Sequence, residues 1–124
     1  DMTVQPLSQP FTVCKVGLET VIDWQIPFTF MGVTDTECSL VCPTQNTPAV
    51  TLAREDGWRA FRVTGSMAFT LVGVLAKLTG TLAERGIPVF AVSTFDTDYV
   101  LVKAEQFDLA LDTLAEAGIE VERG

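Results

Sequence analysis

The sequence predicts an α+β fold in which short strands alternate with two amphipathic helices. Apolar residues recur at helical spacing in the segments 71–82 and 107–117, and short β-rich runs precede and follow both segments. The chain has 124 residues, of which 48% are hydrophobic, so it is long enough to bury a substantial core. We therefore expect a folded globular protein of the α+β class.

The first half of the chain contains a lead-in and three predicted strands. Residues 1–10 hold two prolines and few apolar anchors, so we expect them to be flexible or irregular. The predicted strands follow at 11–16, 28–33 and 37–42. The last two flank Thr34-Asp35-Thr36, which is typical of a hairpin. Residues 43–56 are polar and contain prolines, which indicates the joint between the two halves.

The second half reads as strand, helix, strand, strand, helix, strand. These elements are expected at 58–64, 71–86, 89–94, 99–103, 107–118 and 119–121. This βαββαβ order is the split βαβ arrangement of ferredoxin-like domains. Both helices end in similar segments, in which Gly86 and Gly118 can adopt the left-handed conformation that stops a helix.

An internal repeat predicts that this fold is duplicated. Residues 26–41 align with residues 87–102 without a gap, at a constant offset of 61 (residue 26 with residue 87). The identical pairs are Ile26/Ile87, Pro27/Pro88, Asp35/Asp96, Thr36/Thr97, Leu40/Leu101 and Val41/Val102. Two hairpins that resemble each other only in composition are the alternative, and the matching turn acids favour duplication.

The two copies differ in length. Residues 17–25 alone separate the first two strands of the first copy, whereas residues 65–86 separate those of the second. A crossover helix needs about a dozen residues or more, so the first copy should have a loop or a single helical turn there. We expect a degenerate N-terminal unit at 11–56 and a complete C-terminal unit at 57–124, packed as one compact domain.

Charge and hydropathy exclude several classes of partner. The chain has 16 acidic and 8 basic residues, a formal charge of −8, so it would repel nucleic acid and anionic membrane surfaces. Its apolar runs are too short to cross a bilayer, and its first residues lack the pattern of a secretory signal. These features predict a soluble cytoplasmic protein.

Catalysis, metal binding and cofactor binding are not expected. The chain has no histidine, no phosphate-binding glycine loop of recognised spacing and no cluster of metal ligands. Its cysteines, Cys14, Cys38 and Cys42, lack Cys-x-x-Cys spacing. Cys38 and Cys42 would share one face of a strand and could form a weak metal site, but buried, reduced thiols are the favoured interpretation.

Three segments could bind a ligand. The first is the junction before the first predicted helix, where a glycine lets the backbone approach a ligand and unpaired N–H groups could bind a carboxylate. Its residues are Gly65, Ser66, Met67, Ala68, Phe69 and Thr70. An ordinary helix start, capped by Ser66 or Thr70, is the alternative.

The other two segments are the predicted turns. In the segment 93–99, Asp96 and Asp98 could hold an ammonium or guanidinium group. Asp96 could instead only build the turn, whereas Asp98 leads directly into a strand and is harder to explain in that way. The segment 34–39 of the first copy could complete a composite pocket about an approximate twofold axis. Two independent structural turns are the alternative.

Four segments carry a resemblance to a known family: TDTECSLVCP (34–43), GWR (57–59), VTG (63–65) and STFDTDYVLV (93–102). Together they resemble the small tandem ACT-like proteins related to the eukaryotic cytosolic arginine sensors. The likeness spans nearly the whole chain from 11 to 121, and the Ser-Thr-x-x-Thr-Asp-Tyr run is its most specific part. It implies two ACT-like units of ferredoxin-type topology.

The resemblance also implies a binding site. Amino acids are the usual ligands of the family, held at an interface between units. By position, Thr94, Phe95 and Asp98 look like the pocket lining, residues 67–70 look like its lid, and Ser39 would approach from the other copy. The arginine sensors have two pairs of units where this chain has one pair, so a pocket between pairs would require a homodimer.

The sequence therefore predicts a non-enzymatic regulatory module that binds a small amino acid as a ligand-responsive homodimer. The alternative is a structural or protein-interaction module that dimerises through its sheets without a ligand.

Overall fold

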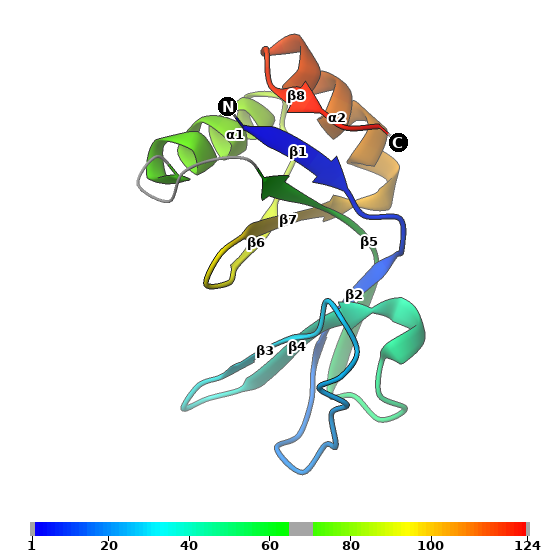
Figure 1. Ribbon diagram of the computed structural model, residues 1–124. Coiled ribbons are helices and arrows are strands. Elements are labelled where there is room, and N and C mark those ends of the chain that lie inside the picture. Colours follow the sequence, from blue (N-terminus) through cyan, green and yellow to red (C-terminus); the bar gives the residue numbers. More distant parts are fainter. Residues whose placement is uncertain (1, 65–70, 124) are drawn as a thin grey trace. The chain divides into compact units, whose positions relative to one another are not determined.

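The computed structural model describes residues 2–64 and 71–123, with the backbone alone for residues 71, 72 and 74. The chain divides into two compact units, which are coloured along the sequence in Figure 1. Unit 1 comprises Asp1–Ser8 and Arg59–Gly124, and unit 2 comprises Gln9–Trp58. The predicted units meet between residues 56 and 57, and the observed units meet between Trp58 and Arg59. The packing of both units as one compact domain stays a prediction.

Unit 2 is an antiparallel sheet without an α-helix in the described residues. Its strands are β2 (Phe11–Lys15), β3 (Phe30–Val33), β4 (Cys38–Pro43) and the first part of β5 (Ala53–Thr64). They pair in the order β3-β4-β2-β5, and one 3₁₀ turn, η1 (Thr44–Asn46), follows β4. Residues 16–29 contain turns and irregular backbone, which confirms that the first copy lacks a crossover helix.

One buried cluster of unit 2 contains all three cysteines. Its buried members are Cys14, Val16, Cys38, Leu40 and Cys42. They share one face of the sheet, because side chains alternate along a strand and Cys14 lies opposite Leu40. Burial raises the pKa of the Cys14 and Cys42 thiols, so both stay protonated at neutral pH. The three thiols are free and buried, as predicted.

A buried hydroxyl ties β2 to β5 in unit 2. Thr12 is fully buried, and its Oγ1 donates a hydrogen bond to Asp56 Oδ1 (2.6 Å). Arg54 Nε donates to the same oxygen (2.9 Å). These hydrogen bonds, first from Thr12 and then from Arg54, lower the pKa of the Asp56 carboxyl. The ionised carboxylate therefore favours the folded state above its ordinary pKa, and this contribution is lost as the pH falls.

We expect Thr12→Val to lower the free energy of unfolding more at pH 7 than at pH 3, because the valine cannot stabilise the ionised Asp56. Urea unfolding at both pH values measures the difference. The matched control is Thr113→Val, since Thr113 is also buried but donates to a backbone carbonyl, Leu109 O. That control should cost about 1 kcal/mol at either pH. Equal losses at both pH values for Thr12→Val would contradict the coupling to Asp56.

Unit 1 has the ferredoxin-like order of elements that the sequence predicts. After the second part of β5 come α1 (Leu71–Glu84), β6 (Phe90–Ser93), β7 (Asp98–Lys103), η3 (Ala104–Gln106), α2 (Phe107–Glu116) and β8 (Glu120–Val121). Gly86 and Gly118 follow the helices with φ of 71° and 87°, the left-handed conformation expected of them. The α+β, ferredoxin-like fold class is confirmed.

The two helices of unit 1 lie side by side over the sheet (Figure 1). Their apolar stripes pack on alternate residues of β5 and β7, since only one face of each strand points to the helices. The core contains Phe61, Val63, Leu78, Leu82, Val100, Val102, Ala110, Leu111 and Leu114, among others. This core anchors β7, whose first residue is Asp98.

The prediction of a flexible lead-in at 1–10 is wrong for residues 3–6. They form β1 (Thr3–Pro6), which lies between β5 and β8, antiparallel to β5 and parallel to β8. Val4 is fully buried in the core of unit 1. The sheet of unit 1 therefore has the order β6-β7-β5-β1-β8. The composition of this segment did not predict a strand, because it contains no run of apolar residues. Backbone pairing along both edges and the burial of one valine stabilise the strand instead.

Candidate functional site

Each unit contains a hairpin that turns through a threonine-based loop. In unit 1, Thr94 N donates to Thr97 O (2.8 Å), and Thr97 N donates to Thr94 Oγ1 (3.2 Å). In unit 2, Thr34 N donates to Glu37 O (2.9 Å), and Glu37 N donates to Thr34 Oγ1 (3.1 Å). The threonine hydroxyl thus replaces a backbone acceptor in both turns. The turn acids of the sequence are not needed to close either loop.

Equivalent positions of the two hairpins are related by an offset of 60 (residue 30 with residue 90), which corrects the predicted offset of 61. The elements β3 and β6, β4 and β7, and η1 and η3 all start and end at this offset. Thr34 therefore corresponds to Thr94, and Cys38 corresponds to Asp98. The offset of 61 was chosen because it aligns identical residues. A shift of one residue exchanges the two faces of a strand, so that offset pairs residues on opposite faces. Duplication of the unit stays a prediction.

The structure brings four of the predicted site residues together at the tip of the β6–β7 hairpin. Thr94, Phe95 and Asp96 are exposed, and Phe95 is 101% exposed. Asp98 begins β7 opposite Ser93 of β6 and is only 8% exposed. An aromatic side chain in solvent thus lies three residues from a buried carboxylate.

Asp98 is the chemically unusual member of this group. Ser93 Oγ donates a hydrogen bond to Asp98 Oδ1. Among the described residues, no lysine or arginine forms an ion pair with Asp98. A buried carboxylate normally has a cationic partner, because desolvation of an isolated charge is costly. Asp98 is therefore suited to accept hydrogen bonds from an ammonium or guanidinium group.

The other predicted site residues lie elsewhere. Gly65, Ser66, Met67, Ala68, Phe69 and Thr70 are outside the described residues. Ser39 lies on β4 in unit 2, where its Oγ donates to Glu37 Oε1 (3.2 Å). The approach of Ser39 to the site at Asp98, and the convergence of that site with the start of α1, stay predictions.

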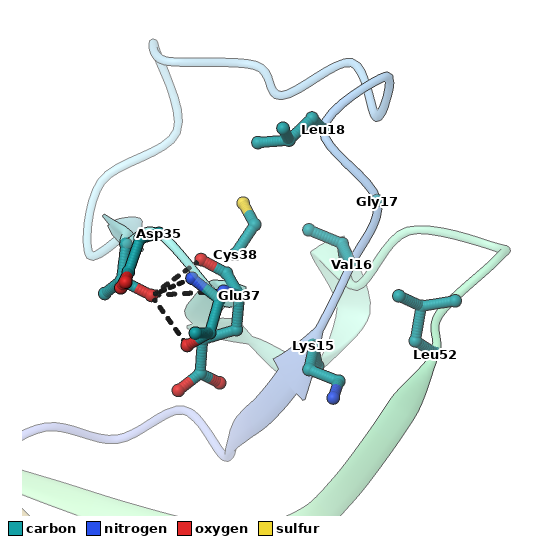
Figure 2. A pocket seen from close by; sticks show the side chains of 10 residues that line it. Lys15, Val16, Gly17, Leu18, Asp35, Glu37, Cys38 and Leu52 are labelled. Carbon is teal, nitrogen blue, oxygen red and sulfur yellow. Dashed lines mark hydrogen bonds between the residues drawn. The ribbon is translucent and has the colours of Figure 1, made fainter.

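Unit 2 has a cavity where β2 ends and the β3–β4 turn closes. Its volume is about 290 Å³, and residues 15–18, 34–38 and Leu52 line it (Figure 2). Sequence reasoning missed Lys15, Val16, Leu18 and Leu52. The available signal was that Leu18 and Leu52 are apolar residues in segments without helical or strand periodicity.

Comparison with known protein families decides the affiliation of the chain. The ACT domain profile matches residues 53–116, which is more than half of the sequence. The chain belongs to the ACT domain family. The match covers β5 through α2 of the ACT fold, including the hairpin that carries Asp98. No curated protein matches this ACT chain. The finer resemblance to the tandem arginine sensors stays a prediction.

Solved structures give the same fold. Protein Atu0741 of Agobacterium tumefaciens is 27% identical, with a TM-score of 0.85 over 99% of this ACT chain and 95% of that one. VC0802 of Vibrio cholerae, a protein of unknown function described as a possible transport protein, is 23% identical with a TM-score of 0.68 over 93% and 88%. The ligand-free regulatory subunit of Thermus thermophilus aspartate kinase is 12% identical with a TM-score of 0.60 over 88% and 93%.

These relatives share the fold of the ACT chain. The likenesses to VC0802 and to the aspartate kinase subunit establish the fold alone, because both identities are low. In the described ranges, no helix has the length and apolar character that crossing a bilayer requires. Likewise, the described residues contain no group of three potential ligands arranged around a metal ion.

Proposed function

We propose that this ACT chain is a cytoplasmic, non-enzymatic regulatory module that binds a small amino acid and changes its homodimer interface or a partner contact in response. The observation that carries the proposal is the buried carboxylate of Asp98, which has a serine hydroxyl as partner and no cation among the described residues. Membership of the ACT family and the likeness to a regulatory subunit of aspartate kinase support it.

The proposed site assigns a role to each end of the ligand. Asp98 binds the amino group or a cationic side chain of the ligand, because a charge-assisted hydrogen bond to a buried carboxylate is strong. The segment 65–70 offers backbone N–H groups to the ligand carboxylate. Thr94, Phe95 and Asp96 border the site.

The test is a thermal-shift screen with the twenty amino acids, followed by calorimetric titration of the amino acid that raises Tm. Asp98→Asn should weaken binding by about 10- to 100-fold, because it removes the charge while keeping an acceptor for Ser93. Asp108→Asn is the matched control, since Asp108 is exposed on α2 and is not part of the proposed site. Its affinity should stay within about twofold of wild type.

The same titrations separate the proposal from a purely structural module. A flat response to all twenty amino acids at millimolar concentration, or an Asp98→Asn variant that binds as tightly as wild type, would contradict the site. Sedimentation velocity with and without the bound amino acid measures the change of assembly. An unchanged sedimentation coefficient at saturation, with no altered partner contact, would contradict the regulatory response.

A further inference from the structure

The cavity of unit 2 has an apolar interior that opens to solvent. Val16 and Cys38 are buried, and Leu18 and Leu52 border the opening. Leu18 is 75% exposed and Leu52 is 67% exposed, although large aliphatic side chains gain free energy from burial. Figure 2 shows Val16, Leu18 and the sulfur of Cys38 around the same space. An aliphatic group placed there would remove both leucines from water.

The chemistry of this cavity differs from that of the site at Asp98 for a structural reason. When the two hairpins are matched by their strands, Cys38 takes the position of Asp98, and Val33 takes the position of Ser93. A hydrogen-bonded polar pair in unit 1 is thus replaced by an apolar pair in unit 2. The unit 2 cavity therefore has no carboxylate at the position of Asp98, and Val16, Leu18 and Leu52 give it an aliphatic surface instead.

Both signs of charge border the cavity. Lys15 and Glu37 lie at the end opposite Leu18 (Figure 2), and Asp35 lies on the same turn as Glu37. Lys15 forms no ion pair with any described residue. One oxygen of Glu37 accepts a hydrogen bond from the Ser39 hydroxyl (3.2 Å), which limits the orientation of the carboxylate. A zwitterion can therefore place its carboxylate near Lys15 and its ammonium near Glu37.

The geometry points to a second ligand site in unit 2, for a small amino acid with a branched aliphatic side chain. The side chain packs on Val16, Leu18 and Leu52, and the charged groups meet Lys15 and Glu37. A volume of about 290 Å³ lies at the small end of ligand pockets, which are roughly 300–1,000 Å³, so the ligand is small. This inference is independent of the site at Asp98, because the two sites share no residue.

The head-group requirement can be measured with three probes that share one aliphatic group. These are L-leucine, 4-methylpentanoate, which lacks the ammonium, and 3-methylbutylamine, which lacks the carboxylate. In ¹H–¹⁵N NMR titrations of the full chain, L-leucine should shift the amides of residues 15–18, 34–38 and 52. 4-Methylpentanoate and 3-methylbutylamine should each bind at least about tenfold more weakly than L-leucine.

Substitutions at the border test the same site. Leu18→Ser and Lys15→Gln should each weaken L-leucine binding by at least about tenfold, because they remove the aliphatic contact and the cation. The matched controls are Leu109→Ser and Lys77→Gln, which change exposed residues on α2 and α1 of unit 1. Both controls should bind L-leucine as wild type does.

The thiol of Cys38 gives a readout that does not depend on amide shifts. Alkylation of the intact chain, followed by peptide mass mapping, reports the rate at each cysteine. L-leucine should slow the modification of Cys38 at least about fivefold more than that of Cys14, which lies outside this cavity's lining. Equal slowing at both cysteines reflects general stabilisation and would count against a ligand seated on Cys38.

Three results would overturn the second site. The first is no response to L-leucine, L-isoleucine or L-valine at about 10 mM. The second is equal affinity for all three head-group probes. The third is a set of shifts confined to residues 94–98 and lost in Asp98→Asn, which would support the proposed function while removing the site in unit 2. Loss of binding in Leu18→Ser with retention in Asp98→Asn supports the second site by itself.

Discussion

Deletion of residues 1–7 is expected to abolish the cooperative folding of unit 1. These residues contain β1, which pairs with β5 on one side and with β8 on the other. Its removal would leave the backbone groups of two strands unpaired and would take Val4 out of the core. We expect loss of the dispersed amide signals of unit 1 in ¹H–¹⁵N NMR spectra and loss of a cooperative thermal transition.

Point substitutions in β1 separate this effect from chain shortening. Val4→Ala should cost about 1.5–3 kcal/mol of unfolding free energy, because the side chain is fully buried. Gln5→Ala is the neighbouring control, since Gln5 is only partly buried and hydrogen-bonds to Glu122 and Arg62, and it should cost less than about 1 kcal/mol. A deletion variant that keeps the wild-type unfolding midpoint would show that β1 is dispensable.

Phe61→Ala is expected to be the most damaging single substitution in the core of unit 1. Phe61 lies on β5, is 0% exposed and belongs to the cluster that joins the sheet to both helices. Removal of a buried phenyl ring typically costs about 3–5 kcal/mol, from lost transfer free energy and the remaining cavity. Denaturant unfolding measured by circular dichroism would report a lower midpoint or an unfolded chain.

The same substitution at Phe95 is the matched control. Phe95 is fully exposed at the tip of the β6–β7 hairpin, so Phe95→Ala should change the unfolding free energy by no more than about 0.5 kcal/mol. A loss at Phe95 comparable to that at Phe61 would mean that the exposed ring is covered in the protein in solution. A small loss at Phe61 would contradict the assignment of the core.

Much of unit 1 could be predicted because its signals are local. The helical spacing of apolar residues predicted both helices, which the structure describes as Leu71–Glu84 and Phe107–Glu116. The glycines that follow them were predicted from the short-range requirement for a left-handed residue at a helix end. The grouping of Phe95 with Asp98 was also local, since they lie three residues apart in one hairpin.

The part of the candidate site that the sequence missed depends on contacts between distant segments. Leu18, the turn at 34–37 and Leu52 come together only because β2 pairs with both β4 and β5. No periodicity marks Leu18 or Leu52, because both lie in connections. The predicted offset between the hairpins was wrong by one residue for a related reason. Identical residues in an alignment do not show which face of the strand each residue occupies.

By itself, the sequence determined the α+β class, the order of the elements from β5 to β8 and the missing crossover helix of unit 2, because periodicity, helix stops and loop length act over a few neighbouring residues. The tertiary structure alone decided that β1 enters the sheet of unit 1, that Cys38 and Asp98 are equivalent, and that a cavity forms beside Lys15. Each of these depends on strand pairing across long stretches of chain, where backbone hydrogen bonds and burial outweigh local preference.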